Sequence, residues 1–140
     1  MNSKYLHQPK RNTPAWLRLA ALFLGISLLL WLPVEDTNEI RVVLAAASVT
    51  TWLALRHLVQ LPAPGSRSLI RYILVGTLAG LAVTPLALFL MAFKTGLHGH
   101  ESPDFTAEQI FFVVYRTHVW GFAGLLLGLG SGLLHMTAPD

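Results

Sequence analysis

Cysteine and charged residues are scarce in this chain of 140 residues: it has no cysteine, and 12% of its residues are charged. The absence of cysteine excludes disulfides, thiolate metal ligands and thiol-based redox chemistry. Ordinary globular chains carry about 25% charged residues, and a chain with so few cannot cover a water-facing surface. The composition therefore excludes a soluble globular enzyme, a disordered tail and a nucleic-acid-binding domain of the usual kind.

Hydrophobic residues are abundant instead, at 54% of the chain, and they gather in long runs. Because a membrane-spanning helix needs about 20 mostly apolar residues, the sequence predicts an all-α integral membrane protein with a single domain, 1–140. We expect the spans at about 15–34, 40–61, 69–93 and 117–136. The predicted fold is a four-transmembrane-helix bundle.

Residues 94–108 form a polar, His-rich stretch before the last run, which we interpret as a loop. Thr106 and Gln109 have the spacing of a capping box, so a helix should begin near Thr106. A helix from there to Met136 would be roughly 46 Å long, against about 30 Å for a bilayer core. We therefore expect a short interfacial helix before the last span, with Arg116 reaching lipid head groups or a nearby carboxylate.

The distribution of charge predicts the orientation in the membrane. Lys and Arg gather in the N-terminal tail and in the connection after the second run, whereas the other two connections are mainly acidic. The acidic residues there are Glu35, Asp36, Glu39, Glu101, Asp104 and Glu108. Because positively charged segments tend to stay in the cytoplasm, both termini should be cytoplasmic and residues 94–108 should lie outside. The expected location is a bacterial inner (plasma) membrane.

Glycines recur at a spacing of four residues in the third and fourth runs, a pattern typical of closely packed membrane helices. They are Gly76 and Gly80 in the third run, and Gly124, Gly128 and Gly132 in the fourth. This glycine-zipper pattern predicts antiparallel packing of the two spans within one chain. The alternative is a face reserved for a partner or a second copy. Pro85, which follows Thr84, predicts a kink in the third span.

The segment between the third and fourth runs carries the only dense set of side chains suited to chemistry. Imidazole and carboxylate groups bind zinc, copper or nickel. The candidate metal ligands are His98, His100, Glu101, Asp104 and His118. No fixed ligand spacing such as HExxH is present, so the favoured interpretation is a solvated loop with incidental histidines.

A b-type haem is a second cofactor hypothesis, because helix bundles hold haem between histidines on facing helices. His57 and His135 fall near the cytoplasmic face, and His118 falls near the outer face with His98 or His100. All of them lie at span ends, where a porphyrin would be poorly buried. The leading expectation is therefore that the chain holds no cofactor.

Catalytic constellations are absent from the predicted spans, which contain no acidic residue in their cores and no phosphate-binding loop. We therefore expect a non-catalytic accessory, assembly or stabilising subunit of a larger membrane complex. Its partners would be the lipid bilayer and other membrane subunits or copies of itself, and not nucleic acid. The alternatives are a metal- or haem-binding membrane protein that uses the outer His-rich loop, and a small channel or transporter, which would need a polar pore face.

Cysteine labelling tests the predicted orientation without background, because the chain has no cysteine of its own. The variants Asn38→Cys and Ser102→Cys should react with an impermeant thiol reagent added to intact cells. Ser66→Cys should react only after the membrane is permeabilised. The reverse labelling pattern would invert the orientation.

Overall fold

The structure is a computed structural model that describes residues 13–34, 37–60, 68–99 and 103–137. Every regular element in these ranges is an α-helix, which confirms the all-helical class. The helices are α1 (Ala15–Trp31), α2 (Glu39–Val59), α3 (Ser68–His98), α4 (Ala107–Tyr115) and α5 (Thr117–Thr137). Part of the charge behind the predicted orientation, in the N-terminal tail, at Glu35 and Asp36 and in residues 61–67, lies outside the described residues.

Three helical segments are long and apolar enough to cross a membrane by length and composition. They are Glu39–Val59, Leu69–His98 and Ala107–Thr137, and the last of them runs through both α4 and α5. α1 is apolar as well, but with 17 residues it is shorter than these segments. The three long segments support a membrane location for the chain.

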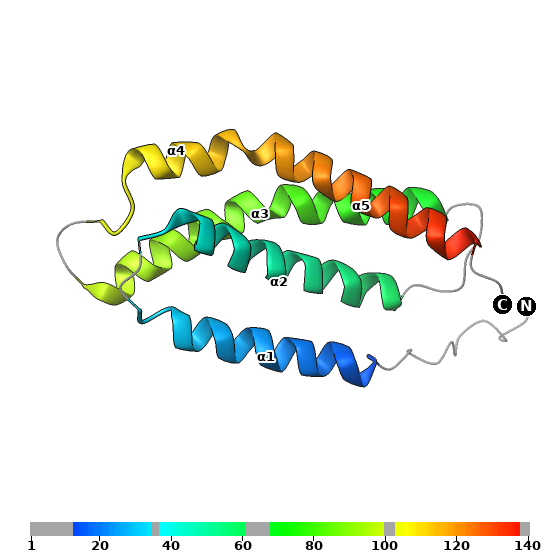
Figure 1. Cartoon of the computed structure of the whole chain (residues 1–140), viewed down its shortest axis with the longest axis horizontal. Coiled ribbons are helices and arrows are strands. Elements are labelled where there is room, and N and C mark those ends of the chain that lie inside the picture. The colour runs from blue at the N-terminus through cyan, green and yellow to red at the C-terminus, as the bar shows by residue number, and fades with distance from the viewer. Residues whose placement is uncertain (1–12, 35–36, 61–67, 100–102, 138–140) are drawn as a thin grey trace, which may run out of the picture.

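The helices are arranged in a row in which each one packs on the next (Figure 1). Within the described ranges, α1 packs on α2, α2 on α3 and α3 on α5, while α4 touches α2, α3 and α5. α1 and α5 therefore form opposite edges of the row. The arrangement differs from a bundle closed on itself, because the backbone of α1 approaches that of α2 alone.

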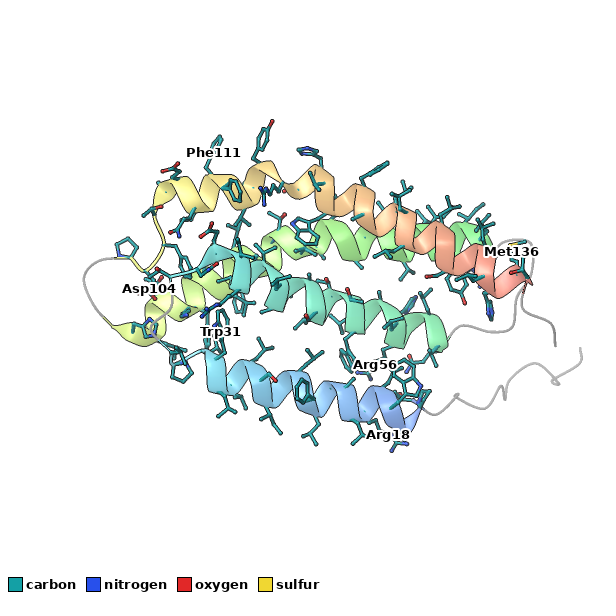
Figure 2. All side chains as sticks on the ribbon, viewed as in Figure 1. Arg18, Trp31, Arg56, Asp104, Phe111 and Met136 are labelled. Carbon is teal, nitrogen blue, oxygen red and sulfur yellow. The ribbon has the colours of Figure 1, made fainter. Side chains whose placement is uncertain are left out.

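Along the helix axes the molecule has two ends, and at each of them some helices begin and others end. α1 and α3 end, and α2 and α4 begin, at what we call the Asp104 end, whereas α5 ends at the opposite, Met136 end (Figure 2). At the Asp104 end, Asn38 caps α2 by accepting a hydrogen bond of 2.9 Å from the backbone N–H of Ile40. Thr106 and Gln109 form the predicted capping box at the start of α4, so that helix start is confirmed.

α3 is longer than the sequence predicted. It continues through Lys94 to His98, so the expected loop 94–108 begins with helical residues, and its predicted start was wrong. The helix ends where Gly99 adopts a left-handed conformation with φ of 65°, which glycine reaches without a steric penalty. The prediction ended α3 at the first charged residue after the apolar run, whereas Gly99 is the residue that stops it.

The backbones of α3 and α5 come into direct contact at the glycines. A Cβ atom added to Gly76, Gly80, Gly124 or Gly128 would lie less than 3.0 Å from backbone atoms of the opposite helix. Gly132 faces the side chains of Leu69 and Tyr72. Any side chain larger than hydrogen at the four backbone contacts would force the two helices apart.

The apolar core lies between α2, α3 and α4. It consists of Val42, Ala46, Val83, Ala87, Leu90, Met91, Phe105 and Val113. Beside it, the hydroxyl oxygens of Thr84 and Thr117 lie 3.0 Å apart, and Thr117 donates to the carbonyl of Val114 at 2.6 Å. The break between α4 and α5 at Arg116 therefore faces the turn of α3 that contains Pro85.

The variant Gly80→Ala tests the backbone contact, because its Cβ would meet the carbonyl of Trp120 on α5. We expect the free energy of unfolding to fall by about 1–3 kcal/mol, the range for overpacking a tight interface. Thermal or denaturant unfolding of the purified chain in detergent measures it.

Gly130→Ala is the matched control, because a Cβ on Gly130 meets nothing within 4 Å. Its stability should be unchanged or higher by up to about 1 kcal/mol, since alanine favours helix over glycine. Equal effects of the two variants would contradict a tight contact at Gly80.

Candidate functional site

A set of polar side chains is buried at the Asp104 end. Lys94 is fully buried, and the side chains of His98 and Asp104 are 9% and 6% exposed. Lys94 and His98 share one face of α3, because residues four apart lie one above the other on a helix. Together with Trp31 at the end of α1, these residues form what we call the Lys94 cluster (Trp31 and Asp104 are labelled in Figure 2).

The ammonium group of Lys94 lies over the indole ring of Trp31, with Nζ 4.4 Å from the ring centroid. The negative face of the ring attracts a cation, and the attraction is stronger where water is excluded. This contact joins α3 to the last residue of α1, although the backbones of the two helices do not pack together. Lys94 therefore holds the edge helix at the Asp104 end.

His98 and Asp104 form a close pair. Nδ1 of His98 lies 2.6 Å from Oδ2 of Asp104, and an imidazole with its proton on Nδ1 donates to the carboxylate. The pair links the last residue of α3 to the segment before α4, and the adjacent Phe105 is 2% exposed. The pair is largely buried, and its contact fixes the end of α3 against the segment before α4.

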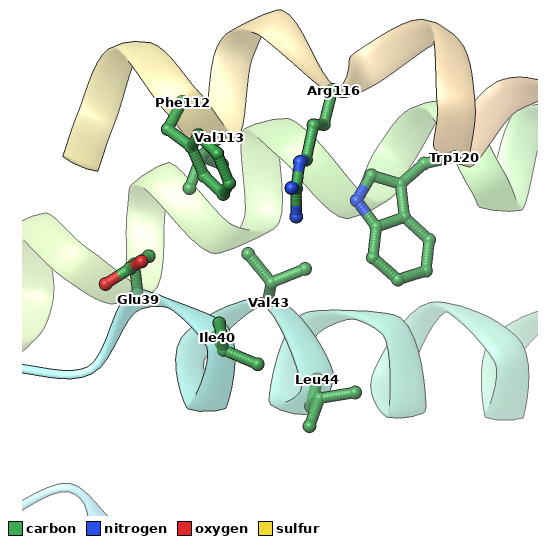
Figure 3. A pocket seen from close by; sticks show the side chains of 8 residues that line it. All are labelled: Glu39, Ile40, Val43, Leu44, Phe112, Val113, Arg116 and Trp120. Atoms are coloured by element: carbon green, nitrogen blue, oxygen red, sulfur yellow. The ribbon is translucent and has the colours of Figure 1, made fainter. Parts of the chain in front are cut away.

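A pocket of about 180 Å³ lies between the start of α2 and the junction of α4 with α5 (Figure 3). Most of its lining is apolar, and it carries one acidic and one basic side chain. The lining residues are Glu39, Ile40, Val43, Leu44, Phe112, Val113, Arg116 and Trp120. The pocket therefore presents both signs of charge against an apolar wall.

Each charged group of the pocket is held by a neighbour. The guanidinium carbon of Arg116 lies 3.7 Å from the centroid of the Phe112 ring, at a spacing of one helical turn. Gln109 donates from Nε2 to the Glu39 carboxylate and to the carbonyl of Thr37, both at 2.9 Å. The amide of Gln109 thus ties the start of α4 to the start of α2 and orients Glu39.

The structure brings together only part of the predicted metal set. His98 and Asp104 are in contact, whereas His118 is exposed on α5 with its ring 5.7 Å from that of Tyr115. His100 and Glu101 lie outside the described residues. In the part of the chain that the structure describes, no group of three or more histidine or acidic side chains could hold a metal ion. The metal site stays a prediction.

Two of the histidines considered for haem, His57 and His135, lie in the last turns of their helices. His57 is exposed near the end of α2, and His135 is exposed near the end of α5, with its ring 5.5 Å from that of Tyr72. The haem hypothesis also stays a prediction.

The sequence analysis missed two features, the burial of Lys94 and the contact between Arg116 and Phe112. Lys94 is buried on the face of α3 that also carries His98, and this shared face becomes visible once Gly99 is taken as the end of α3. Arg116 was expected at head groups or a carboxylate, and the structure places its guanidinium over Phe112. Arg116 and Phe112 are four residues apart on a helix, and this spacing could have indicated the contact.

Comparison of the chain with protein-family models, with curated proteins and with solved structures finds no match. The functional interpretation therefore rests on the residues of this chain.

The variant Asp104→Ala tests the role of the His98–Asp104 pair in stability. It leaves His98 buried without its carboxylate, so the free energy of unfolding should fall by about 1–3 kcal/mol. Glu108→Ala is the control, because Glu108 is an exposed carboxylate in the first turn of α4 and should cost about 0.5 kcal/mol. Thermal unfolding in detergent compares them, and equally small losses would show that the pair does not hold the connection.

Proposed function

We propose that the chain is a non-catalytic accessory, assembly or stabilising subunit of a larger complex in a bacterial inner membrane. The proposal includes four spans, α1, α2, α3 and α5, with α4 in the interface before the last span and both termini in the cytoplasm. The observation that carries it is the open row of helices, in which α1 forms an edge and, among the described residues, its backbone approaches that of α2 alone.

The lengths of α1 and α5 support this topology. α5, with 21 residues, is about 31 Å long at roughly 1.5 Å per residue, which matches a bilayer core of about 30 Å without α4. α1, with 17 residues, is about 26 Å long by the same measure and has Trp16 and Trp31 at its two ends. Tryptophan is enriched at both membrane interfaces, so α1 is a short span with an aromatic ring at each boundary.

The exposed surface of α1 supports a partner at this edge. Large apolar side chains of α1 are exposed, namely Leu19, Leu22, Phe23, Leu29 and Leu30. The glycine faces of α3 and α5, by contrast, contact each other within the chain. Those faces are therefore occupied, and the exposed surface of α1 is the one we assign to a helix of another subunit.

The Lys94 cluster favours a structural function over an enzymatic one. Lys94 is fully buried with its ammonium group over the Trp31 ring, and His98 is held by Asp104. Each of these groups is engaged by a neighbour that joins two parts of the chain, which supports a structural role for the cluster.

Site-specific photocrosslinking tests the proposal. A photoreactive phenylalanine analogue at Phe23 on α1, where the native side chain is 72% exposed, should crosslink to one other membrane protein. That protein should also co-purify in a fixed ratio in mild detergent. The same analogue at Phe111 on α4, where the native side chain is 73% exposed, should crosslink to lipid alone.

Two outcomes would contradict this function. One is a chain that purifies alone or only with its own copies. The other is crosslinking of Phe23 to lipid alone, as at Phe111, which would leave the α1 edge as ordinary lipid-facing surface.

A further inference from the structure

The pocket between α2 and the α4–α5 junction has a definite order of polarity along α2. Figure 3 shows Glu39 at the start of α2, Arg116 directed toward Val43, and Trp120 farther along α2. Glu39 begins α2 and so lies at the Asp104 end, while Arg116 lies deeper along the helix. The charged groups are therefore acidic and then basic from the Asp104 end inward, with apolar side chains around both.

A phospholipid with an ethanolamine head group has the complementary charges in matching positions. Its ammonium group is outermost, its phosphate follows after two carbons, and its glycerol and acyl chains lie deepest. An arginine guanidinium suits a phosphate because its planar fork of N–H donors matches the phosphate oxygens. A carboxylate accepts hydrogen bonds from a primary ammonium group. A choline head group offers a cation without N–H donors, and a glycerol head group leaves Glu39 facing only negative charge.

The size and opening of the pocket fit a head group with acyl chains outside it. The volume of about 180 Å³ is below the roughly 300 Å³ at which whole-ligand pockets begin. Ile40, Leu44 and Phe112 are 54%, 57% and 40% exposed, so the pocket opens onto an apolar surface. Acyl chains would lie along that surface, parallel to α2 and α5.

We propose that this pocket binds a zwitterionic phosphatidylethanolamine, with its phosphate on Arg116 and its ammonium group on Glu39. Phe112 holds the guanidinium in place by its ring, and Gln109 holds the carboxylate by its amide. The charges are thus positioned before the lipid arrives, which lowers the ordering cost of binding. This site does not depend on a protein partner at α1, because α1 contributes no residue to the pocket.

Native mass spectrometry of the purified full chain with defined lipids tests this site. The probes are phosphatidylethanolamine, phosphatidylcholine and phosphatidylglycerol with identical acyl chains. We expect phosphatidylethanolamine to be retained most strongly by the native chain. The variant Arg116→Gln should weaken its binding about tenfold or more, because a charge-assisted contact is lost.

Glu39→Gln separates selectivity from binding and preserves an acceptor for Gln109. It should remove the preference for phosphatidylethanolamine over phosphatidylglycerol while keeping phosphate binding at Arg116. Arg56→Gln is the matched control, since Arg56 is also exposed and lies over an aromatic ring, 5.5 Å from Trp52, near the other end of α2. Its lipid binding should match that of the native chain.

Three results would overturn the site. The native chain could retain the three lipids equally, Arg116→Gln could bind phosphatidylethanolamine as tightly as Arg56→Gln does, or inorganic phosphate could displace the lipid. The last would make the pocket a simple anion site. If Arg116→Gln does not fold, Glu39→Gln still decides the question, because unchanged selectivity in that variant contradicts the assigned ammonium contact.

Discussion

Direct backbone contact between α3 and α5 fixes the central helix of the row, on which α2 and then α1 depend. In hydrocarbon, burial of apolar surface gives no drive for helices to associate, so close van der Waals packing must supply it. The glycines at positions 76, 80, 124 and 128 permit this packing because they bring backbone against backbone. α2 then adds Val42 and Ala46 to the apolar core of α3.

Polar contacts act mainly at the Asp104 end, where the connections between helices are fixed. Helix ends leave backbone groups without partners in the helix itself, and Asn38 and the Thr106–Gln109 capping box satisfy some of them. The same Gln109 amide reaches Glu39, so capping α4 also positions a side chain of the pocket. A local rule for starting a helix thus has a consequence for a site built from two helices.

The sequence predicted the helical class, the start of α4 and three apolar segments long enough to cross a membrane, for physical reasons that act locally. Length, hydropathy and capping depend on neighbouring residues, as Thr106 and Gln109 illustrate. The open row could not be predicted, because a leucine facing lipid and a leucine facing another helix have the same hydropathy. The candidate site was predicted in part: His98 and Asp104 were chosen together, but as metal ligands, and Lys94 was not connected with Trp31.

α2 lies between the α1 edge of the row and the pocket. On one side the indole N–H of Trp52 donates to the carbonyl of Leu17 on α1 at 2.9 Å. At its start, α2 supplies Glu39 and Leu44 to the pocket shared with α4 and α5. A partner at α1 and a lipid in the pocket would therefore occupy different surfaces and could be bound together. Since both contact or flank α2, a shift of that helix is the shortest route by which one could alter the other.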